Sequence, residues 1–248
     1  MNKCVKKVFS VTGDLVRHII YPDQIKCIVC ETELGEDSVY GLCDRCELKR
    51  NSQYCETCGR YLYSLATYCN DCKSSERGFD VARAPIIMEG QAHSIIHNFK
   101  YGNSRWLAPY LTEYMADSLV REMWDVDLVL PVPLHQKRER QRGYNQSVLI
   151  AKELSKKRGI EYDWQLLVRK VDTPYLARMS RQERAEVIKG AFELMDKKAV
   201  KGKRVLLVDD VFTTGATADE CARVLKKGGA AWVAVLTFAS GAIKVPIV

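Results

Sequence analysis

Residues 205–217 read VLLVDDVFTTGAT, and this stretch decides the fold of the chain. Val205–Val208 is an apolar run typical of a buried strand, and the carboxylates of Asp209 and Asp210 follow at its carboxyl end. The apolar residues that follow recur at the spacing of one helix face, and they are Ala218, Cys221, Ala222 and Leu225. The stretch therefore predicts a strand, a turn and the start of a helix.

The predicted turn has the chemistry of a phosphate site. It consists of Thr213, Thr214, Gly215, Ala216 and Thr217. The first amides of a helix lack intrahelical partners and lie at the positive end of its dipole, so they suit a phosphate. The glycine allows close approach, the threonines add hydroxyl donors, and Asp209 and Asp210 can accept hydrogen bonds from a ribose diol. The alternative is an ordinary strand–helix junction with a cap, but a cap needs only one polar residue.

These thirteen residues resemble the signature of type I phosphoribosyltransferases, which bind 5-phosphoribosyl 1-diphosphate (PRPP) with Mg²⁺. The resemblance implies that Asp209 and Asp210 contact the ribose hydroxyls, and that Thr213–Thr217 holds the 5-phosphate. The pattern differs from a P-loop, which needs a lysine after its last glycine, and from the G-x-G-x-x-G turn of dinucleotide-binding folds.

Length and composition suit a soluble chain with one large or two smaller domains. The chain has 248 residues, of which 47% are apolar, enough to build a core. No stretch approaches the roughly 20 apolar residues of a membrane span, and the N-terminus lacks a signal-peptide core and cleavage site, so we expect a cytoplasmic protein. The formal charge of +7 favours polyanionic partners without identifying one.

We expect three segments: a lead helix over 1–24, a double zinc ribbon over 25–76 and an α/β domain over 77–248. The lead carries apolar residues near helical spacing and is closed by Pro22. We expect it to pack on the body of the protein. Because its polar positions are basic, a helix on a membrane surface is the alternative.

Eight of the ten cysteines form four C-x-x-C pairs, which are Cys27 and Cys30, Cys43 and Cys46, Cys55 and Cys58, and Cys69 and Cys72. Loops of 12, 8 and 10 residues separate the pairs. This spacing predicts two tetrahedral Cys₄ zinc sites. Disulfides are disfavoured in a reducing cytosol, and a redox motif would need one pair rather than four.

The four cysteine pairs can share two ions in sequential or interleaved order. We favour sequential pairing, because it closes shorter loops at lower entropic cost. The segment has few large aliphatic residues, so metal binding would supply its folding free energy and both zinc ions would be structural. Cys221 lies outside the pattern and is interpreted as a small apolar residue on the helix after the signature.

From Phe79 onward the sequence alternates between strand and helix patterns. Strands are predicted over 81–88, 127–133, 164–171 and 232–238. Helices are predicted after Ala92, ending at Gly102, and over 107–119. Right-handed crossovers between such strands require a parallel sheet with its binding crevice at the carboxyl ends of the strands. We therefore predict a Rossmann-like α/β fold of the type I phosphoribosyltransferase kind.

A proline-flanked and basic segment follows the strand predicted over 127–133. Two prolines, the second of them Pro133, set a rigid turn, and Lys137, Arg138, Arg140 and Arg142 place four cations within six residues before a helix starts near Asn145. Such a loop suits a diphosphate, although a solvated basic helix start is the alternative. The run is similar to the PVPLHxxRxxxRGxNQ segment of the competence protein F (ComF) family, which implies that Pro133, Arg138 and Arg142 contact PRPP and that Arg138 joins Asp209 and Asp210 in catalysis.

Together the cysteine pairs, the basic segment and the signature resemble the ComF family over nearly the whole chain. The resemblance implies a role in natural transformation and the uptake of single-stranded DNA, with other competence proteins as further partners. The chain departs from the family's usual Gln and Asn at Leu176 and Val187, which removes two amides that would contact a substrate base or position a loop. Two hypotheses stay open: an active phosphoribosyltransferase of nucleotide metabolism with an unidentified acceptor, and a PRPP sensor on a DNA-handling adaptor.

Cations around the crevice, Lys137, Arg138, Arg140 and Arg142 above all, are predicted to carry binding of single-stranded nucleic acid. Four tyrosines of the ribbon are candidate stacking platforms, namely Tyr54, Tyr61, Tyr63 and Tyr68. Packing of these rings on the zinc knuckles is the alternative.

Overall fold

The structure is a computed structural model, and it describes residues 26–35, 40–173 and 181–243. Its contacts divide the chain into two compact units, Met1–Glu47 and Leu48–Val248. The predicted lead helix over 1–24 lies outside the described residues. Within the part of the chain that the structure describes, no helix is long and apolar enough to cross a membrane.

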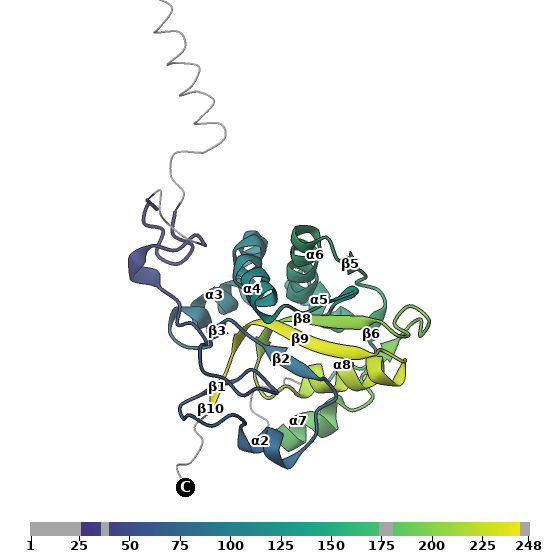
Figure 1. Cartoon of the computed structure of the whole chain (residues 1–248). Coiled ribbons are helices and arrows are strands. Elements are labelled where there is room, and N and C mark those ends of the chain that lie inside the picture. Colours follow the sequence, from purple (N-terminus) through teal and green to yellow (C-terminus); the bar gives the residue numbers. More distant parts are fainter. Residues whose placement is uncertain (1–25, 36–39, 174–180, 244–248) are drawn as a thin grey trace, which may run out of the picture. The chain divides into compact units, whose positions relative to one another are not determined.

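The larger unit is built on a parallel sheet with the strand order β2-β9-β8-β4-β5, in which β3 also pairs with β9 (Figure 1). The strands are β2 (Val81–Arg83), β3 (Ile86–Ile87), β4 (Leu128–Pro131), β5 (Glu161–Tyr162), β8 (Arg204–Phe212) and β9 (Trp232–Ser240). Every pairing within this sheet is parallel. The prediction of a parallel α/β sheet is therefore confirmed.

Helices cover both faces of this sheet. The helices are α3 (Gln91–Tyr101), α4 (Ala108–Glu122), α5 (Gln136–Arg142), α6 (Gln146–Arg158), α7 (Arg181–Ile188) and α8 (Ala216–Lys227), with the 3₁₀ turn η2 (Arg105–Leu107) before α4. Figure 1 shows α4 and α6 on one face and α8 on the other, with α7 beside α8. The signature strand β8 lies between β4 and β9, so both its edges are paired and it lies at the centre of the core.

The apolar patterns of the sequence account for the core. Val205–Val208 is fully buried in β8, and β9 is buried from Val233 to Ser240. In α8 the predicted face is buried, because Ala218, Cys221, Ala222 and Leu225 are each at most 5% exposed. Burial of these side chains on both faces of β8 and β9 fixes the strand that carries the signature.

Two predicted strands differ from the observed ones. The stretch 81–88 is divided at Ala84 and Pro85 into β2 and β3, because proline has no amide hydrogen for the ladder. The stretch 164–171 forms β6 (Leu167–Arg169), which pairs antiparallel with β7 (Phe192–Leu194) as a separate ribbon and not with the parallel sheet.

The second half of the predicted ribbon lies in the larger unit. It contains β1 (Tyr61–Leu62), which pairs with β10 (Ala242–Ile243) after the last strand of the sheet, and α2 (Asn70–Ser74). Leu62 is fully buried in the same apolar cluster as Phe79 and Val205. In the smaller unit the described backbone has the turn η1 (Asp44–Cys46), a bridge between Lys26 and Glu33, and few large buried side chains.

Candidate functional site

The signature forms a small pocket where β8 ends and α8 begins. Strand β8 stops at Phe212, and α8 starts at Ala216 after the N-cap residue Gly215. The pocket has a volume of about 80 Å³, enough for several water molecules. Its lining residues are Arg184, Asp209, Val211, Phe212, Thr213, Thr214, Gly215, Ala216, Thr217, Ala218 and Thr237. The predicted phosphate loop and one of the two acids therefore share one cavity.

Gly215 is required by the protein's own packing. Its φ of +81° lies in the left-handed region that favours glycine. A Cβ atom at this position would lie 2.3 Å from the ring of Phe212. The sequence suggested that this glycine leaves room for the ligand, whereas the atoms that require it belong to the strand that precedes the loop.

Asp209 faces the pocket and accepts two hydrogen bonds from the protein. Its Oδ1 accepts from Ser147 Oγ at 2.7 Å and from the backbone amide of Asp210 at 2.9 Å. Burial of the carboxylate raises the pKa of Asp209 to about 6, and the negative charge of Asp210 adds to this effect. This carboxyl group can therefore change its charge just below neutral pH.

Asp210 points to the other side of the strand and pairs with Lys100 at the end of α3. Lys100 Nζ lies 2.9 Å from Asp210 Oδ2, and the side chain of Asp210 is only 6% exposed. Burial would lower the pKa of Lys100, but Asp210 and Asp209 outweigh this effect and raise it. Sequence reasoning missed this lysine as a site residue, since its only signal is its place next to the buried Phe99 at a helix end.

The start of α6 holds these groups together. Tyr144, Asn145, Gln146 and Ser147 are all buried. Asn145 caps the helix by accepting from the amide of Ser147 and also donates to the carbonyl of Val132 at the end of β4. Gln146 and Tyr144 both donate to the carbonyl of Phe99 in α3. The Tyr-Asn-Gln-Ser run thus joins α3, β4 and β8 around the two acids.

The basic segment is a helix and not the predicted loop. His135 accepts from the amide of Lys137 as the N-cap of α5, and Gly143 ends this helix in the left-handed conformation. Arg138 is half-buried, donates to the carbonyl of Thr173 and lies 4.0 Å from Asp172. A capped start and a glycine end stabilise the helix, which places successive cations on different faces.

The other predicted residues of this segment lie in different surroundings. Pro133 is buried two residues after the end of β4. Arg142 donates to Gln146, and its guanidinium lies 5.2 Å from the ring centre of Tyr101. Lys137 and Arg140 are exposed. Pro133, Arg138 and Arg142 are not among the residues lining the described pocket.

Arg184 is a pocket residue from an unexpected element. It lies on α7, and its Nη1 donates to Thr213 Oγ1 at 3.1 Å. Arg77 reaches the same loop, with its Nη1 3.4 Å from the carbonyl oxygen of Thr214. Val187, one of the two departures from the family pattern, is half-buried on α7, and the other, Leu176, lies outside the described residues.

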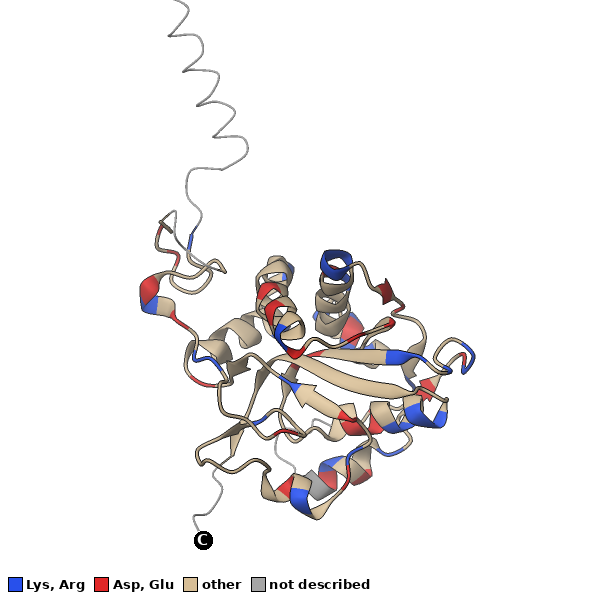
Figure 2. Cartoon of the chain, viewed as in Figure 1, with Lys and Arg blue, Asp and Glu red and all other residues tan. Residues whose placement is uncertain are grey.

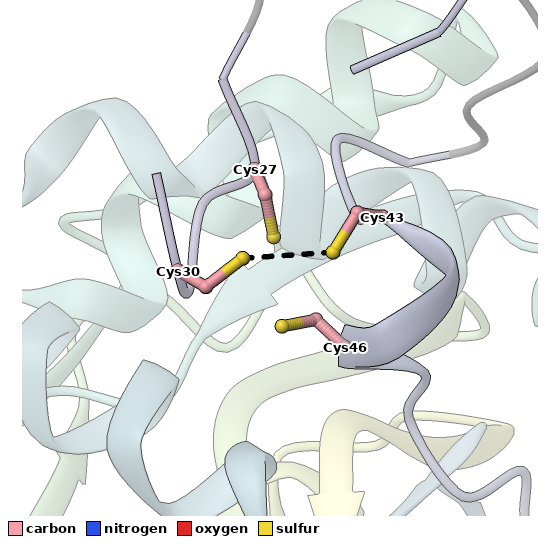
Figure 3. Close-up of side chains that lie close together, drawn as sticks. All are labelled: Cys27, Cys30, Cys43 and Cys46. Atoms are coloured by element: carbon pink, nitrogen blue, oxygen red, sulfur yellow. Dashed lines mark hydrogen bonds between the residues drawn. The ribbon is translucent and has the colours of Figure 1, made fainter. Parts of the chain in front are cut away.

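The first cysteine cluster brings together Cys27, Cys30, Cys43 and Cys46 in the smaller unit (Figure 3). Its four sulfur atoms lie within 4.8 Å of one another, and Cys30 and Cys43 are 3.5 Å apart. Tetrahedral zinc with bonds of about 2.3 Å would separate its sulfur ligands by roughly 3.8 Å. This cluster therefore fits a structural metal ion.

The second cluster consists of Cys55, Cys58, Cys69 and Cys72 in the larger unit. Arg60 is 7% exposed, and its guanidinium lies 3.5 Å from the sulfur atoms of both Cys58 and Cys69. Four thiolates around a divalent ion leave a net charge of −2, which this arginine partly offsets. Each cluster contains two consecutive C-x-x-C pairs, which is the grouping that sequential pairing predicts.

The tyrosines of the ribbon are largely engaged in contacts within the protein. Tyr54 is half-buried, with Arg83 4.6 Å from its ring centre, and its hydroxyl donates to Glu122. Tyr61 is half-buried and packs edge-on against Tyr63. Tyr63 and Tyr68 are 51% and 44% exposed.

Comparisons with known proteins agree with this geometry. A family model described as a phosphoribosyl transferase domain matches residues 115–245, which include the whole β8–α8 junction. Competence protein F of Haemophilus influenzae is 32% identical over 216 residues, covering 82% of this chain and 92% of that protein. DNA utilization protein YhgH of Escherichia coli K12 is 27% identical, covering 84% and 94%. Competence protein ComFC of Bacillus subtilis is 25% identical, covering 85% and 93%. The predicted fold class is confirmed.

Proposed function

Because this chain belongs to the competence protein F family and contains its phosphoribosyl transferase domain, we propose that it binds PRPP with Mg²⁺ in the β8–α8 pocket. We further propose that it acts in the cytoplasm on incoming single-stranded DNA, together with other competence proteins. The relatives' names, competence protein and DNA utilization protein, support this process. The main observation in favour of this ligand is the β8–α8 junction, where the end of a strand that bears two acids meets a threonine-rich helix start.

The residues of the pocket match the two ends of a phosphoribosyl group. Residues 213–217 include the loop and the first two residues of α8, a helix of 12 residues, so the amides and the dipole at this helix start favour the 5-phosphate. Arg184, hydrogen-bonded to Thr213, adds a positive charge beside this loop. Asp209 lines the same pocket and can accept hydrogen bonds from ribose hydroxyls when it is ionised.

Mg²⁺ fits a site of this kind as a partner of the ligand. Magnesium usually binds one or two carboxylates together with phosphate oxygens of the substrate. Asp209 and Asp210 offer carboxylates at the end of β8, but Lys100 neutralises Asp210 in the structure. Asp209 is therefore the carboxylate that would support the Mg²⁺ complex, while Lys100 orients Asp210.

If the protein is a transferase, a bond forms between the acceptor and C1 of the ribose as the bond to pyrophosphate breaks. Catalysis would then depend on positioning and on cations that stabilise the leaving pyrophosphate. Arg138 and Arg142 on and at the end of α5 are the residues we assign to that role. Sensing of PRPP without transfer is the second candidate, favoured by the departures at Leu176 and Val187.

Titration calorimetry with PRPP, with and without Mg²⁺, tests the binding proposal. We expect Asp209→Asn combined with Asp210→Asn to weaken binding at least about tenfold, since Asp209 loses the charge that faces the pocket and Asp210 loses the charge that pairs with Lys100. Glu186→Gln, which changes an exposed carboxylate of α7, is the matched control and should bind as the wild type does. Equal affinity of the double variant and the wild type would contradict the proposal.

Pyrophosphate release separates the two candidates. A transferase should release pyrophosphate from PRPP with at least one of a panel of nucleobase acceptors, and the double variant should not. A sensor should bind PRPP without release under any of these conditions. Pyrophosphate release distinguishes the two candidates only once calorimetry has established that the protein binds PRPP.

We also propose that both cysteine clusters hold structural zinc. Four sulfur atoms lie within 4.8 Å of one another in each cluster, and thiolate is a preferred ligand of this ion. Elemental analysis of protein purified without chelators should find about two zinc ions per chain. Metal-free protein that remains folded would contradict this assignment.

A further inference from the structure

We propose that Tyr101, Arg105, Trp106 and Arg142 form a stacking platform for single-stranded nucleic acid. This proposal rests on the proposed function in DNA handling and names the contact surface for it. The platform joins the end of α3, the turn η2 and the end of α5. It differs from the ribbon tyrosines that the sequence suggested for the same purpose.

Two large aromatic side chains are exposed on this platform. Tyr101 and Trp106 are each 55% exposed. Trp106 packs edge-on against Tyr110 with 6.2 Å between ring centres, which leaves much of its surface open to solvent. Tyr101 and Trp106 lie five positions apart in the chain, on two segments that Arg142 and Arg105 each link to the end of α5. Exposed aromatic side chains that gather in one region of a surface mark interaction sites more often than isolated ones do.

Arginines lie beside the exposed rings and link the three segments. Arg105 Nη2 donates to the carbonyl of Gly143 at 2.8 Å, so η2 is joined to the end of α5. The guanidinium of Arg105 also lies 4.9 Å from the ring centre of Tyr144. Arg142 lies 5.2 Å from the ring centre of Tyr101. His97 also packs against Tyr101, with 5.1 Å between ring centres. These contacts position Tyr101 and the two arginines.

The combination of aromatic rings and guanidinium groups suits single-stranded nucleic acid as the ligand. Unpaired bases can stack on aromatic faces in any sequence, while arginine contacts the phosphates between them. A duplex has its bases already stacked on each other, and an acidic peptide has no bases to stack. Charged residues of both signs are spread along the larger unit (Figure 2), so net charge alone does not locate this surface.

The platform is connected to the proposed phosphoribosyl site. Tyr101 directly follows Lys100, whose ammonium pairs with Asp210. Arg142 donates to Gln146, the neighbour of the Ser147 that bonds Asp209. A single-stranded nucleic acid bound on the platform would therefore contact the same helix ends that orient the two acids.

Fluorescence anisotropy with the full-length, zinc-loaded chain tests this surface. The probe is a labelled thymidine oligonucleotide of about 20 nucleotides, measured at one fixed salt concentration. Loss of one stacked base should weaken binding roughly 5- to 150-fold in Tyr101→Ala or in Trp106→Ala. Tyr101→Phe keeps the ring and should bind like the wild type. Trp164→Ala is the matched control, because Trp164 is 54% exposed but follows β5, away from the platform in sequence.

An abasic oligonucleotide of the same length separates stacking from charge. The wild type should bind it more weakly than the normal probe, and Tyr101→Ala should lose nothing further. If Tyr101→Ala lost the same affinity for the normal and the abasic oligonucleotide, stacking would be overturned. Full displacement of the normal oligonucleotide by polyglutamate would overturn it as well. If Tyr101→Ala lowers the unfolding temperature, the affinity of Trp106→Ala, which changes a residue of η2, decides whether the platform stacks bases.

The outcomes also separate this inference from the function on which it rests. Wild-type-like binding by both alanine variants would overturn the platform and leave DNA binding intact. A wild-type chain that binds no oligonucleotide would overturn DNA binding and the platform with it. PRPP binding by the wild type and by Trp106→Ala, whose changed residue does not line the β8–α8 pocket, tests the proposed phosphoribosyl site separately.

Discussion

Lys100 Nζ at the end of α3 lies 2.9 Å from Asp210 Oδ2 in the signature strand. The two residues are 110 positions apart, and their contact closes one side of the proposed site. Only 6% of the Asp210 side chain and 26% of the Lys100 side chain are exposed. The carboxylate is therefore shielded from water and depends on this lysine for compensation.

Removal of the Lys100 charge should destabilise the protein. We expect Lys100→Met to cost about 1–3 kcal/mol, less than a fully buried pair would, because the lysine is partly exposed. Lys100→Met combined with Asp210→Asn should recover part of this loss. Lys157→Met is the control, since its pair with Glu113 is exposed and should contribute under about 1 kcal/mol. Urea denaturation measures all four proteins, and equal losses at the two lysines would contradict the prediction.

The raised pKa of Asp209 makes stability depend on pH. The pKa is about 6 in the folded protein and 3.8 as the ordinary value, so between about pH 4 and pH 6 the unfolded chain binds fewer protons. The contribution of this group to stability should therefore fall as pH rises through that window and stay constant above it. Asp209→Asn cannot ionise. The unfolding free energies of wild type and variant are measured at pH 4, 5, 6 and 7. The wild-type value minus the variant value should fall between about pH 4 and pH 6 and stay level above pH 6.

The two cysteine clusters should differ in their effect on the larger unit. Cys27→Ser with Cys30→Ser should lose one zinc ion and leave the unfolding of Leu48–Val248 unchanged, because the contacts divide at Glu47–Leu48. Cys55→Ser with Cys58→Ser should lose the other ion and lower the unfolding temperature by roughly 10 °C or more. These two cysteines lie in the apolar core of the sheet. Elemental analysis with calorimetry measures both effects, and similar unfolding temperatures for the two variants would contradict the difference.

The cations of α5 should affect DNA binding unequally. Lys137 and Arg140 are exposed, so changing both to Ala should reduce the log–log salt slope by about 1.4, or 0.7 for each phosphate that is no longer neutralised. Lys197→Ala with Lys198→Ala changes two exposed lysines outside this helix and is the control. Arg138 and Arg142 are half-buried, and their replacement should weaken PRPP binding as well. PRPP and DNA should compete if they share this helix. Anisotropy across a salt series reports the slopes, and an unchanged slope would exclude α5 as the DNA-binding helix.

Gly215→Ala should destabilise the protein through Phe212. The substitution forces alanine into the left-handed region, at about 1–3 kcal/mol, and places its Cβ 2.3 Å from the ring. Gly190→Ala is the matched control, because Gly190 also has a positive φ, of +70°, but has no atom within 4 Å of the new Cβ. Combination with Phe212→Leu should relieve the additional destabilisation. Urea denaturation compares the variants, and equal losses at the two glycines would show that the ring gives way.

The sequence by itself determined the elements whose signals are local. The apolar run Val205–Val208, the helical spacing after it and the short loops between cysteine pairs predicted a central strand, a buried helix face and two sequential clusters. Such features depend on residues within one turn, strand or loop, so neighbours in the sequence carry enough information. The signature's place at a strand end and helix start followed from the same local pattern.

Only the tertiary structure decided which distant residues meet at the site. Lys100 reaches Asp210 because α3 ends beside β8, and Ser147 reaches Asp209 because the cap of α6 is tied to β4. The β6–β7 ribbon and the Gly215–Phe212 packing also had no local signal. Pairing of separate segments depends on how the whole core packs, and periodicity within one segment does not specify its partner. The sequence thus predicted the strand that bears the acids, and packing decided which residues each acid contacts.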